Sequence, residues 1–130
     1  MDLADTLKWI HLIAAAVWTG GLITLAFLVL ALRRAGAERS QIQASARAFG
    51  RLSWAALAIA VGTGVWQMEV SGYPYSVVTL KLSLVVIAAV LALVHQLTSR
   101  SISPALRGIG QAVILVVSIL IFGAAVAAFG

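Results

Sequence analysis

A histidine in the first apolar segment is the residue of this chain best suited to chemistry. His11 precedes Trp18 by seven residues, so the two side chains lie two turns apart on one face of a helix. An ionisable ring inside a membrane is costly unless it has a partner, which makes His11 a candidate functional residue. A structural role is the alternative, in which the ring bonds a neighbouring carbonyl or interfacial water.

Three other side chains could take part in binding, and each has a structural alternative. Lys81 lies about one turn inside the third apolar segment, where it could bind a ligand or extend to the interface. Met68 lies at the end of the second segment, where its thioether could bind a soft metal ion or its side chain could simply be an apolar residue at the helix end. His95 follows Lys81 by fourteen residues, about 21 Å along a helix, so the two cannot share one small site within a monomer. We interpret His95 as an interfacial residue.

Composition predicts the class of protein. Of 130 residues, 62% are hydrophobic and 10% are charged, which is typical of an integral membrane protein whose partner is the lipid bilayer. The net charge of +5 comes from basic residues between apolar segments, so we expect topology signals and no nucleic-acid partner. The absence of cysteine excludes disulfides, thiolate metal sites and thiol catalysis. The first apolar run is too long for a signal-peptide core, so we expect a retained first span.

The apolar segments predict an all-α protein, a single four-helix membrane bundle over residues 1–130. Its expected spans are residues 7–32, 52–68, 77–97 and 109–129, with a turn at 69–76. Asp5 or Thr6 is the expected cap of the first helix, and Ser40 that of the second, whose polar start precedes the membrane. Ser103 and Pro104 form a typical start for the fourth helix.

Small residues predict where helices approach one another. Ala16, Gly20 and Thr24 recur every four residues, and Gly21 adds to the bare surface. In the second span, Gly62-Thr63-Gly64 permits a close approach or a bend, and the threonine hydroxyl can bond to its own helix.

The arginines predict the orientation. They lie in the loops after the first and third spans, whereas Glu69 is the charged residue near the turn after the second. The positive-inside rule therefore predicts that both termini are outside, in the periplasm. His11 and Lys81 then enter from the same face at similar depths. The candidate pocket in this outer half consists of these two residues with Trp9, Trp18, Trp66 and Met68.

Two ligands fit that pocket. Imidazole and thioether groups suit copper, with His11 and Met68 as metal ligands. Histidine can also ligate haem iron axially, with His11, Lys81 and Trp18 forming the cofactor site and the lysine contacting a propionate or the iron. The residues alone leave both possibilities open.

The order of motifs resembles a known family. Residues 8–11 (KWIH) with 18–22 (WTGGL) look like the first helix of CopD-type copper-resistance membrane proteins. Residues 47–52 (RAFGRL) leading into 62–64 (GTG) resemble its second helix, and residues 80–82 (LKL) its lysine-bearing third. The likeness covers nearly the whole chain. It implies copper handling or copper-ion transport across a bacterial-type inner (plasma) membrane, with a periplasmic copper protein as a possible partner.

A second family is similar in part. HemJ-type protoporphyrinogen oxidases share the Lys-x-x-His opening and a lysine in a later helix, which His11 and Lys81 match. That likeness implies haem b binding and redox chemistry. A structural subunit of a larger membrane complex, or a homo-oligomer, is the third hypothesis. No catalytic residue is singled out, so we expect a binding or transport protein more than an enzyme.

Overall fold

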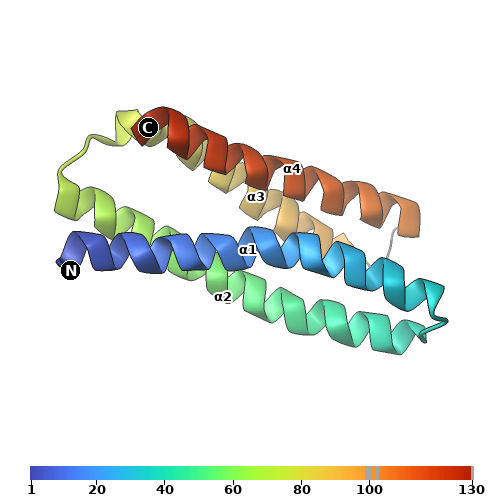
Figure 1. The fold of residues 1–130 in the computed structure, drawn as a ribbon. Helices are drawn as coiled ribbons and strands as arrows, with labels where there is room; N and C mark the ends of the chain where they lie inside the picture. The colour runs from blue at the N-terminus through green and yellow to red at the C-terminus, as the bar shows by residue number, and fades with distance from the viewer. Residues whose placement is uncertain (99–100, 102, 130) are drawn as a thin grey trace. The chain divides into compact units, whose positions relative to one another are not determined.

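The chain folds into four long helices. The computed structural model describes residues 1–98, 101 and 103–129, and no strand occurs among them. The helices are α1 (Leu3–Arg34), α2 (Arg39–Ser71), α3 (Thr79–Thr98) and α4 (Pro104–Phe129), as Figure 1 shows. A short 3-10 helix, η1 (Tyr75–Val78), precedes α3. The predicted all-α class is confirmed.

Each of the four helices is long and apolar enough to cross a membrane. The candidate spans are Leu3–Arg34, Arg39–Ser71, Tyr75–Thr98 and Pro104–Ala128. Even the 20 residues of α3 rise about 30 Å, the thickness of the hydrocarbon core. Large apolar side chains are widely exposed, with Phe27 and Leu97 each 72% exposed. These features suggest an integral membrane protein.

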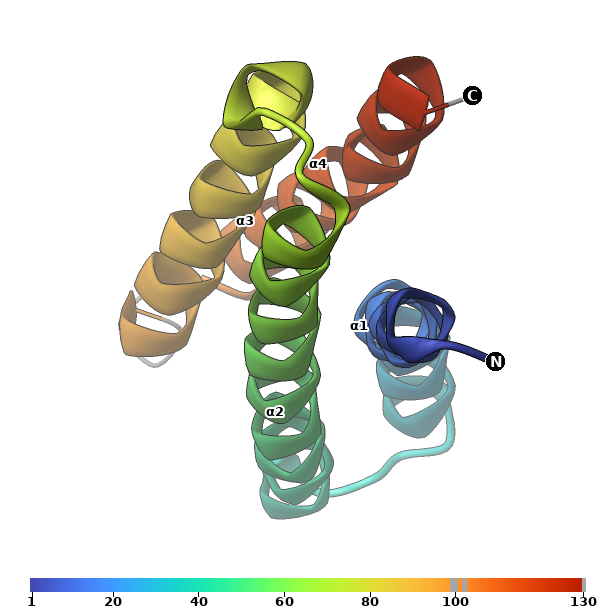
Figure 2. The same cartoon turned by 90° about the vertical axis from the view of Figure 1, so that its left-hand side faces the viewer.

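The chain divides into two compact helical hairpins. The first comprises Met1–Tyr73, in which α1 and α2 run antiparallel, and the second comprises Pro74–Gly130, in which α3 and α4 do so (Figures 1 and 2). Each hairpin is described by itself below. A single four-helix bundle stays a prediction.

The start of α1 differs from the prediction. Asp2 caps the helix, because its carboxylate accepts from the backbone N–H of Asp5 at 2.8 Å. The predicted caps Asp5 and Thr6 are therefore wrong, and both residues lie inside the first turns. Asp2 prevails because it places its carboxylate opposite the N–H three residues later.

The start of α2 also differs from the prediction. Glu38 precedes the helix and forms a capping box with Gln41, whose side-chain oxygen accepts from the Glu38 N–H at 3.0 Å. The predicted cap Ser40 is wrong, since it lies within the first turn and donates to the Glu38 carboxylate at 3.4 Å. With 33 residues, α2 rises about 50 Å, which exceeds the hydrocarbon core and agrees with a polar start outside it.

The remaining helix ends follow common cap chemistry. Gly72 ends α2 with φ of +70°, so the turn begins there and the predicted turn at residue 69 is one helical turn too early. The predicted start of α4 is confirmed, because Ser103 Oγ accepts from the Leu106 N–H at 3.3 Å and Pro104 is the first helical residue.

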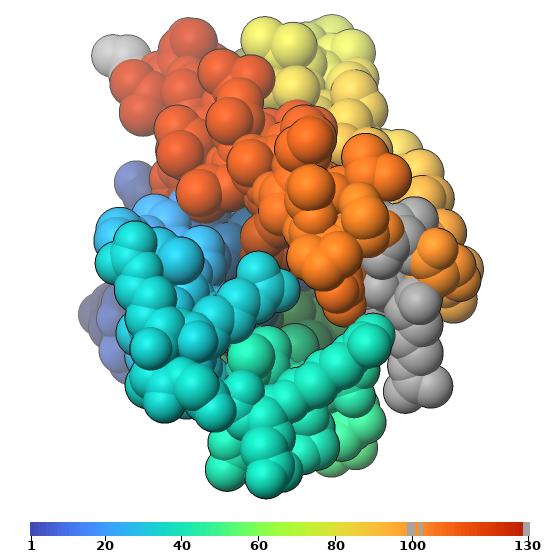
Figure 3. Space-filling model, turned by 90° about the vertical axis from the view of Figure 1, so that its right-hand side faces the viewer, coloured from blue at the N-terminus to red at the C-terminus, as the bar shows by residue number. Residues whose placement is uncertain are grey.

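The turn between α1 and α2 carries an exposed group of arginines. Arg33, Arg34 and Arg39 flank it and are all exposed, as are Arg47 and Arg51 farther along α2. In Figure 3, long side chains extend from this cyan segment. The exposure agrees with a turn that lies in water or among headgroups.

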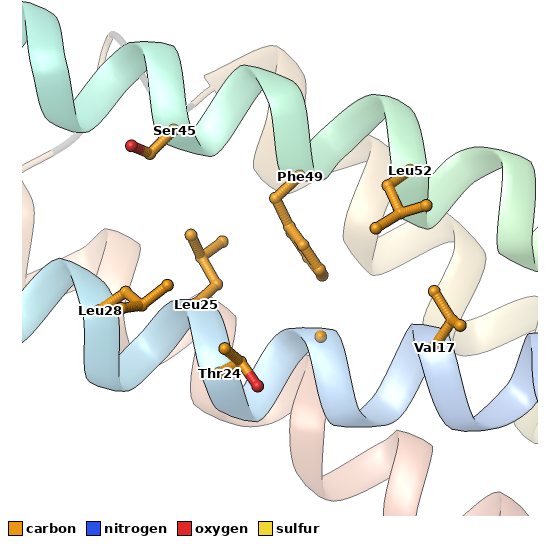
Figure 4. A pocket seen from close by; sticks show the side chains of 8 residues that line it. Val17, Thr24, Leu25, Leu28, Ser45, Phe49 and Leu52 are labelled. Atoms are coloured by element: carbon orange, nitrogen blue, oxygen red, sulfur yellow. The ribbon is translucent and has the colours of Figure 1, made fainter.

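A heptad-like stripe of α1 faces α2. Its buried members are spaced by four or seven residues: Leu7, Ala14, Trp18 and Leu22. Gly21 lies beside this stripe and receives the ring of Phe49 from α2, which Figure 4 shows pointing toward α1. The ring comes so close that a Cβ at position 21 would overlap it.

Of the small residues predicted to permit a close approach, Gly21 does so. Ala16, Gly20 and Thr24 are exposed, and a Cβ at Gly20 would have no neighbour within 4 Å among the described residues. The stripe of these three residues therefore does not make the α1–α2 contact, and its contact with another helix stays a prediction. Beside Phe49 lies an open hollow of about 330 Å³ that contains none of the candidate site residues.

A pair of alanine substitutions tests this packing. Gly→Ala at position 20 or 21 adds the same helix propensity, about 1 kcal/mol, so the difference between the two variants isolates the overlap with Phe49. We expect Gly21→Ala to be less stable than Gly20→Ala by about 1–3 kcal/mol. The measurement is the free energy of unfolding by SDS titration in mixed micelles. Equal stability of the two variants would contradict the packing.

Candidate functional site

His11 lies on the face of α1 that contacts α2. Its Nδ1 is 2.7 Å from the backbone carbonyl oxygen of Ala60 and 3.3 Å from the hydroxyl of Thr63. The ring is half-buried, and its partners are 49 and 52 residues away in the sequence. The bond to a carbonyl that the structural alternative gave is present, and the carbonyl belongs to another helix.

This contact fixes the tautomer of the neutral ring. A carbonyl oxygen can only accept, so Nδ1 carries the proton and donates it to Ala60. The lone pair of the neutral imidazole is then on Nε2. Histidines that bind metals usually donate their other N–H to a carbonyl or carboxylate in this way, which sets the ring orientation and raises the basicity of the ligating nitrogen.

Gly64 makes the approach of the ring possible. A Cβ at this position would lie 3.2 Å from His11 Cε1 and 3.4 Å from His11 Nδ1, closer than most side-chain contacts. The predicted close approach in residues 62–64 is thus confirmed at Gly64, whereas a Cβ at Gly62 would meet no described atom within 4 Å. Gly64 therefore sets the distance between the imidazole and the α2 backbone.

Thr63 satisfies its own hydroxyl within α2 and remains close to the ring. Its Oγ1 donates to the Ile59 carbonyl at 2.6 Å and lies 3.3 Å from that of Ala60. The predicted return of this hydroxyl to the backbone is confirmed. Thr63 thereby offers an oxygen lone pair on the Nδ1 side of His11, which further favours the Nδ1–H tautomer.

Trp18 is buried against α2, two turns from His11. Its ring makes an edge-to-face contact with Trp54, with centroids 6.4 Å apart and planes at 68°. Because His11 and Trp18 both contact α2, the prediction that they share one face of α1 is confirmed. Trp18 therefore contributes an aromatic contact between α1 and α2, two turns from His11.

Met68 lies on the same helix as the partners of His11. Ala60, Gly64 and Met68 recur every four residues, so they share a face of α2, and Met68 is half-buried. Gly64 and Met68 are about 6 Å apart along the axis. Because helical side chains lean toward the N-terminus of their helix, we expect the Met68 side chain to extend back along α2 toward Gly64.

Lys81 and His95 belong to the second hairpin. Both lie in α3 on the stripe that contains the buried Ala88, and both are half-buried. His95 packs on α4, where a Cβ at Gly110 would be 3.0 Å from His95 Nδ1. The ring is therefore a helix–helix contact, and the interpretation of His95 as a residue of the membrane interface stays a prediction.

The first hairpin thus brings His11 and Trp18 onto the α1–α2 contact, and Met68 lies farther along α2 on the face of Ala60 and Gly64. No group of three or more His, Cys, Asp or Glu residues that could hold a metal ion occurs in the part of the chain that the structure describes. The sequence matches no protein-family model, and comparisons with curated proteins and with solved structures find no match.

The residue types of the sequence do not indicate the group that orients the histidine, because the Ala60 carbonyl is a backbone atom. Trp54 and Phe49, which contact α1 elsewhere, have no feature in the sequence that separates them from other apolar residues. A usable signal was present in the spacing of Ala60, Thr63 and Gly64, three and four residues apart, which places two small residues and a hydroxyl on one face.

The tautomer of His11 can be measured directly. We expect ¹⁵N NMR of histidine-labelled protein in micelles, at a pH where the ring is neutral, to show the Nδ1–H form for His11, with His95→Gln used for assignment. Gly64→Ala should reduce that population because the ring must move from the Ala60 carbonyl, whereas Gly62→Ala should not. A dominant Nε2–H form in the unmodified protein would contradict the geometry.

Proposed function

We propose that this chain is a CopD-like integral membrane protein that binds copper transiently through His11 and Met68 during copper handling or transport. The observation that carries the proposal is the hydrogen bond from His11 Nδ1 to the Ala60 carbonyl, since it leaves the lone pair on Nε2 and orients it. Imidazole and thioether together suit Cu(I), which accepts low coordination numbers and soft ligands.

Two protein ligands suit a cargo better than a resident metal. A tight site would add further ligands, whereas a transported ion must be released. The position of Met68, four residues after Gly64 on the same face of α2, supports this role, since a Cβ at Gly64 would lie 3.2 Å from His11 Cε1. The resemblance of residues 8–22 and 47–64 to CopD-type helices supports the same function, with a periplasmic copper protein as a possible donor or acceptor.

Copper binding gives the sharpest test of this function. We expect His11→Ala to weaken Cu(I) affinity by more than about 100-fold, Met68→Leu by about tenfold, and Gly64→Ala by about 10–100-fold through the misplaced ring. The measurement is competition with a chromogenic Cu(I) chelator on full-length protein in micelles. His95→Ala is the matched control, and an equal loss in that variant would show that any histidine suffices and contradict the site.

Haem b is the second candidate, because the same hydrogen bond prepares His11 to ligate haem iron. A bound haem would supply redox chemistry. In the first hairpin, His11 Nε2 would ligate the iron. Lys81 as the contact of a propionate stays a sequence-based prediction. If the purified protein is coloured, with a Soret band that is lost in His11→Ala and shifted in Lys81→Ala, the ligand is haem and the copper proposal is wrong.

A structural subunit of a larger complex is the third candidate. Colourless, copper-free protein that co-purifies with a larger complex would favour it.

We also propose that both termini face the periplasm of a bacterial-type inner membrane. Four crossings place the termini on the same side, and the exposed arginines beside the α1–α2 turn favour the cytoplasm for that turn.

Reporter fusions test the orientation. Alkaline phosphatase fused after Gly130 should be active, because the enzyme folds only in the periplasm. The same enzyme inserted after Ala37, in the α1–α2 turn, should be inactive and serves as the control. The reverse pattern would overturn the orientation.

A further inference from the structure

The second hairpin contains two buried polar nitrogens without a partner. Arg107 Nε and Gln111 Nε2 make no hydrogen bond in the described structure. The two residues are four apart in α4, so they lie on one face of the helix. Gly110 lies between them and touches His95, which directs this face toward α3.

Both nitrogens are donors that require an acceptor. The guanidinium of arginine stays charged and only donates, and a side-chain amide nitrogen also only donates. A buried donor without an acceptor costs as much as a lost hydrogen bond or more, and a charged one costs most. Next to them, the imidazole of His95 is a third polar group on the α3 side. The α3–α4 contact therefore includes three polar side chains, two of which carry a donor that needs an acceptor.

The hairpin itself contains no anion that could be this acceptor. Residues 74–130 include no Asp or Glu, and the four acidic residues of the chain are Asp2, Asp5, Glu38 and Glu69. Of these, Glu38 follows α1 and is engaged in the capping box of α2. The charge of Arg107 thus calls for an anion from outside the α3–α4 hairpin.

The position along α4 indicates where that anion lies. Arg107 and Gln111 are the fourth and eighth residues of a helix that begins at Pro104, about 5–11 Å from its start. In a helix that crosses the bilayer, this is the level at which the hydrocarbon core meets the headgroups. The partial positive charge of the helix N-terminus acts in the same direction. In Figure 3, the first turns of α4 are the orange segment at the surface.

We infer that the α3–α4 hairpin binds the phosphate of an anionic phospholipid through Arg107 and Gln111, beside His95. A phosphodiester supplies the oxygen acceptors that the two donors lack and the negative charge that the hairpin lacks. Basic recesses between membrane helices commonly hold such headgroups. The shared chemistry is the phosphate oxyanion, for which a free phosphate ion is the other possible source.

Native mass spectrometry of the full-length protein in neutral detergent tests this inference. The probes are dioleoyl phosphatidylglycerol, dioleoyl phosphatidylcholine and inorganic phosphate. We expect one phosphatidylglycerol to bind most tightly, and Arg107→Gln and Gln111→Leu each to raise its apparent Kd about tenfold through the loss of a buried hydrogen bond. Arg39→Gln, an equal loss of charge at an exposed site in the other hairpin, should leave the Kd unchanged.

Each contrary result overturns a defined part of the inference. If Arg39→Gln raised the Kd for phosphatidylglycerol as much as Arg107→Gln does, the attraction would be diffuse and no defined site would exist. If phosphatidylcholine bound as tightly as phosphatidylglycerol, the site would not require an anionic lipid, and the inference would be wrong. Inorganic phosphate that binds and displaces the lipid would identify a free anion as the ligand. Helicity by circular dichroism checks each variant. If Arg107→Gln fails to fold, Gln111→Leu decides, since it removes a donor without changing charge, and unaltered binding would refute the site.

Discussion

The hydrogen bond from His11 to the Ala60 carbonyl is the contact on which the candidate site depends. A polar ring within an apolar helix is tolerated only if its hydrogen bonds are made, and here the partner is the backbone of the neighbouring helix. That choice of partner has two consequences. The helices must approach closely at Gly64, and the ring must present Nε2, the nitrogen suited to a metal or haem iron.

Glycine serves the same purpose at three helix–helix contacts. Gly21 receives the Phe49 ring, Gly64 the His11 ring, and Gly110 the His95 ring. In each case another glycine one or two residues away, at positions 20, 62 and 108, has open space where a Cβ would be. An aromatic or imidazole ring against a bare backbone therefore fixes the spacing within each hairpin. Small residues permit such spacing because association within a bilayer relies on close packing and polar contacts.

The two hairpins treat their polar groups differently. In the first, His11 and Thr63 are satisfied by carbonyls of α2. In the second, Ser118 is buried and donates to the Ile114 carbonyl at 2.8 Å, whereas Arg107 and Gln111 retain donors without a protein acceptor. The first hairpin thus satisfies these polar groups with its own backbone, whereas the second leaves two donors unsatisfied in the part of the chain that the structure describes.

The sequence by itself determined the number and class of the helices, because apolar runs of this length have few alternatives in a bilayer. It also determined the cap at Ser103 and Pro104 and the shared stripe of Lys81 and His95, which follow from local spacing. The sequence-based prediction placed the first two caps at Asp5 or Thr6 and at Ser40, whereas Asp2 and Glu38 form them. It failed because several side chains within one turn could bond the same N–H groups. Only the tertiary structure decided that Gly21 and Gly64 carry the contacts and that His11 is protonated on Nδ1. Those outcomes depend on which faces of two helices meet, and a carbonyl 49 residues away leaves no trace in the residue types around the histidine.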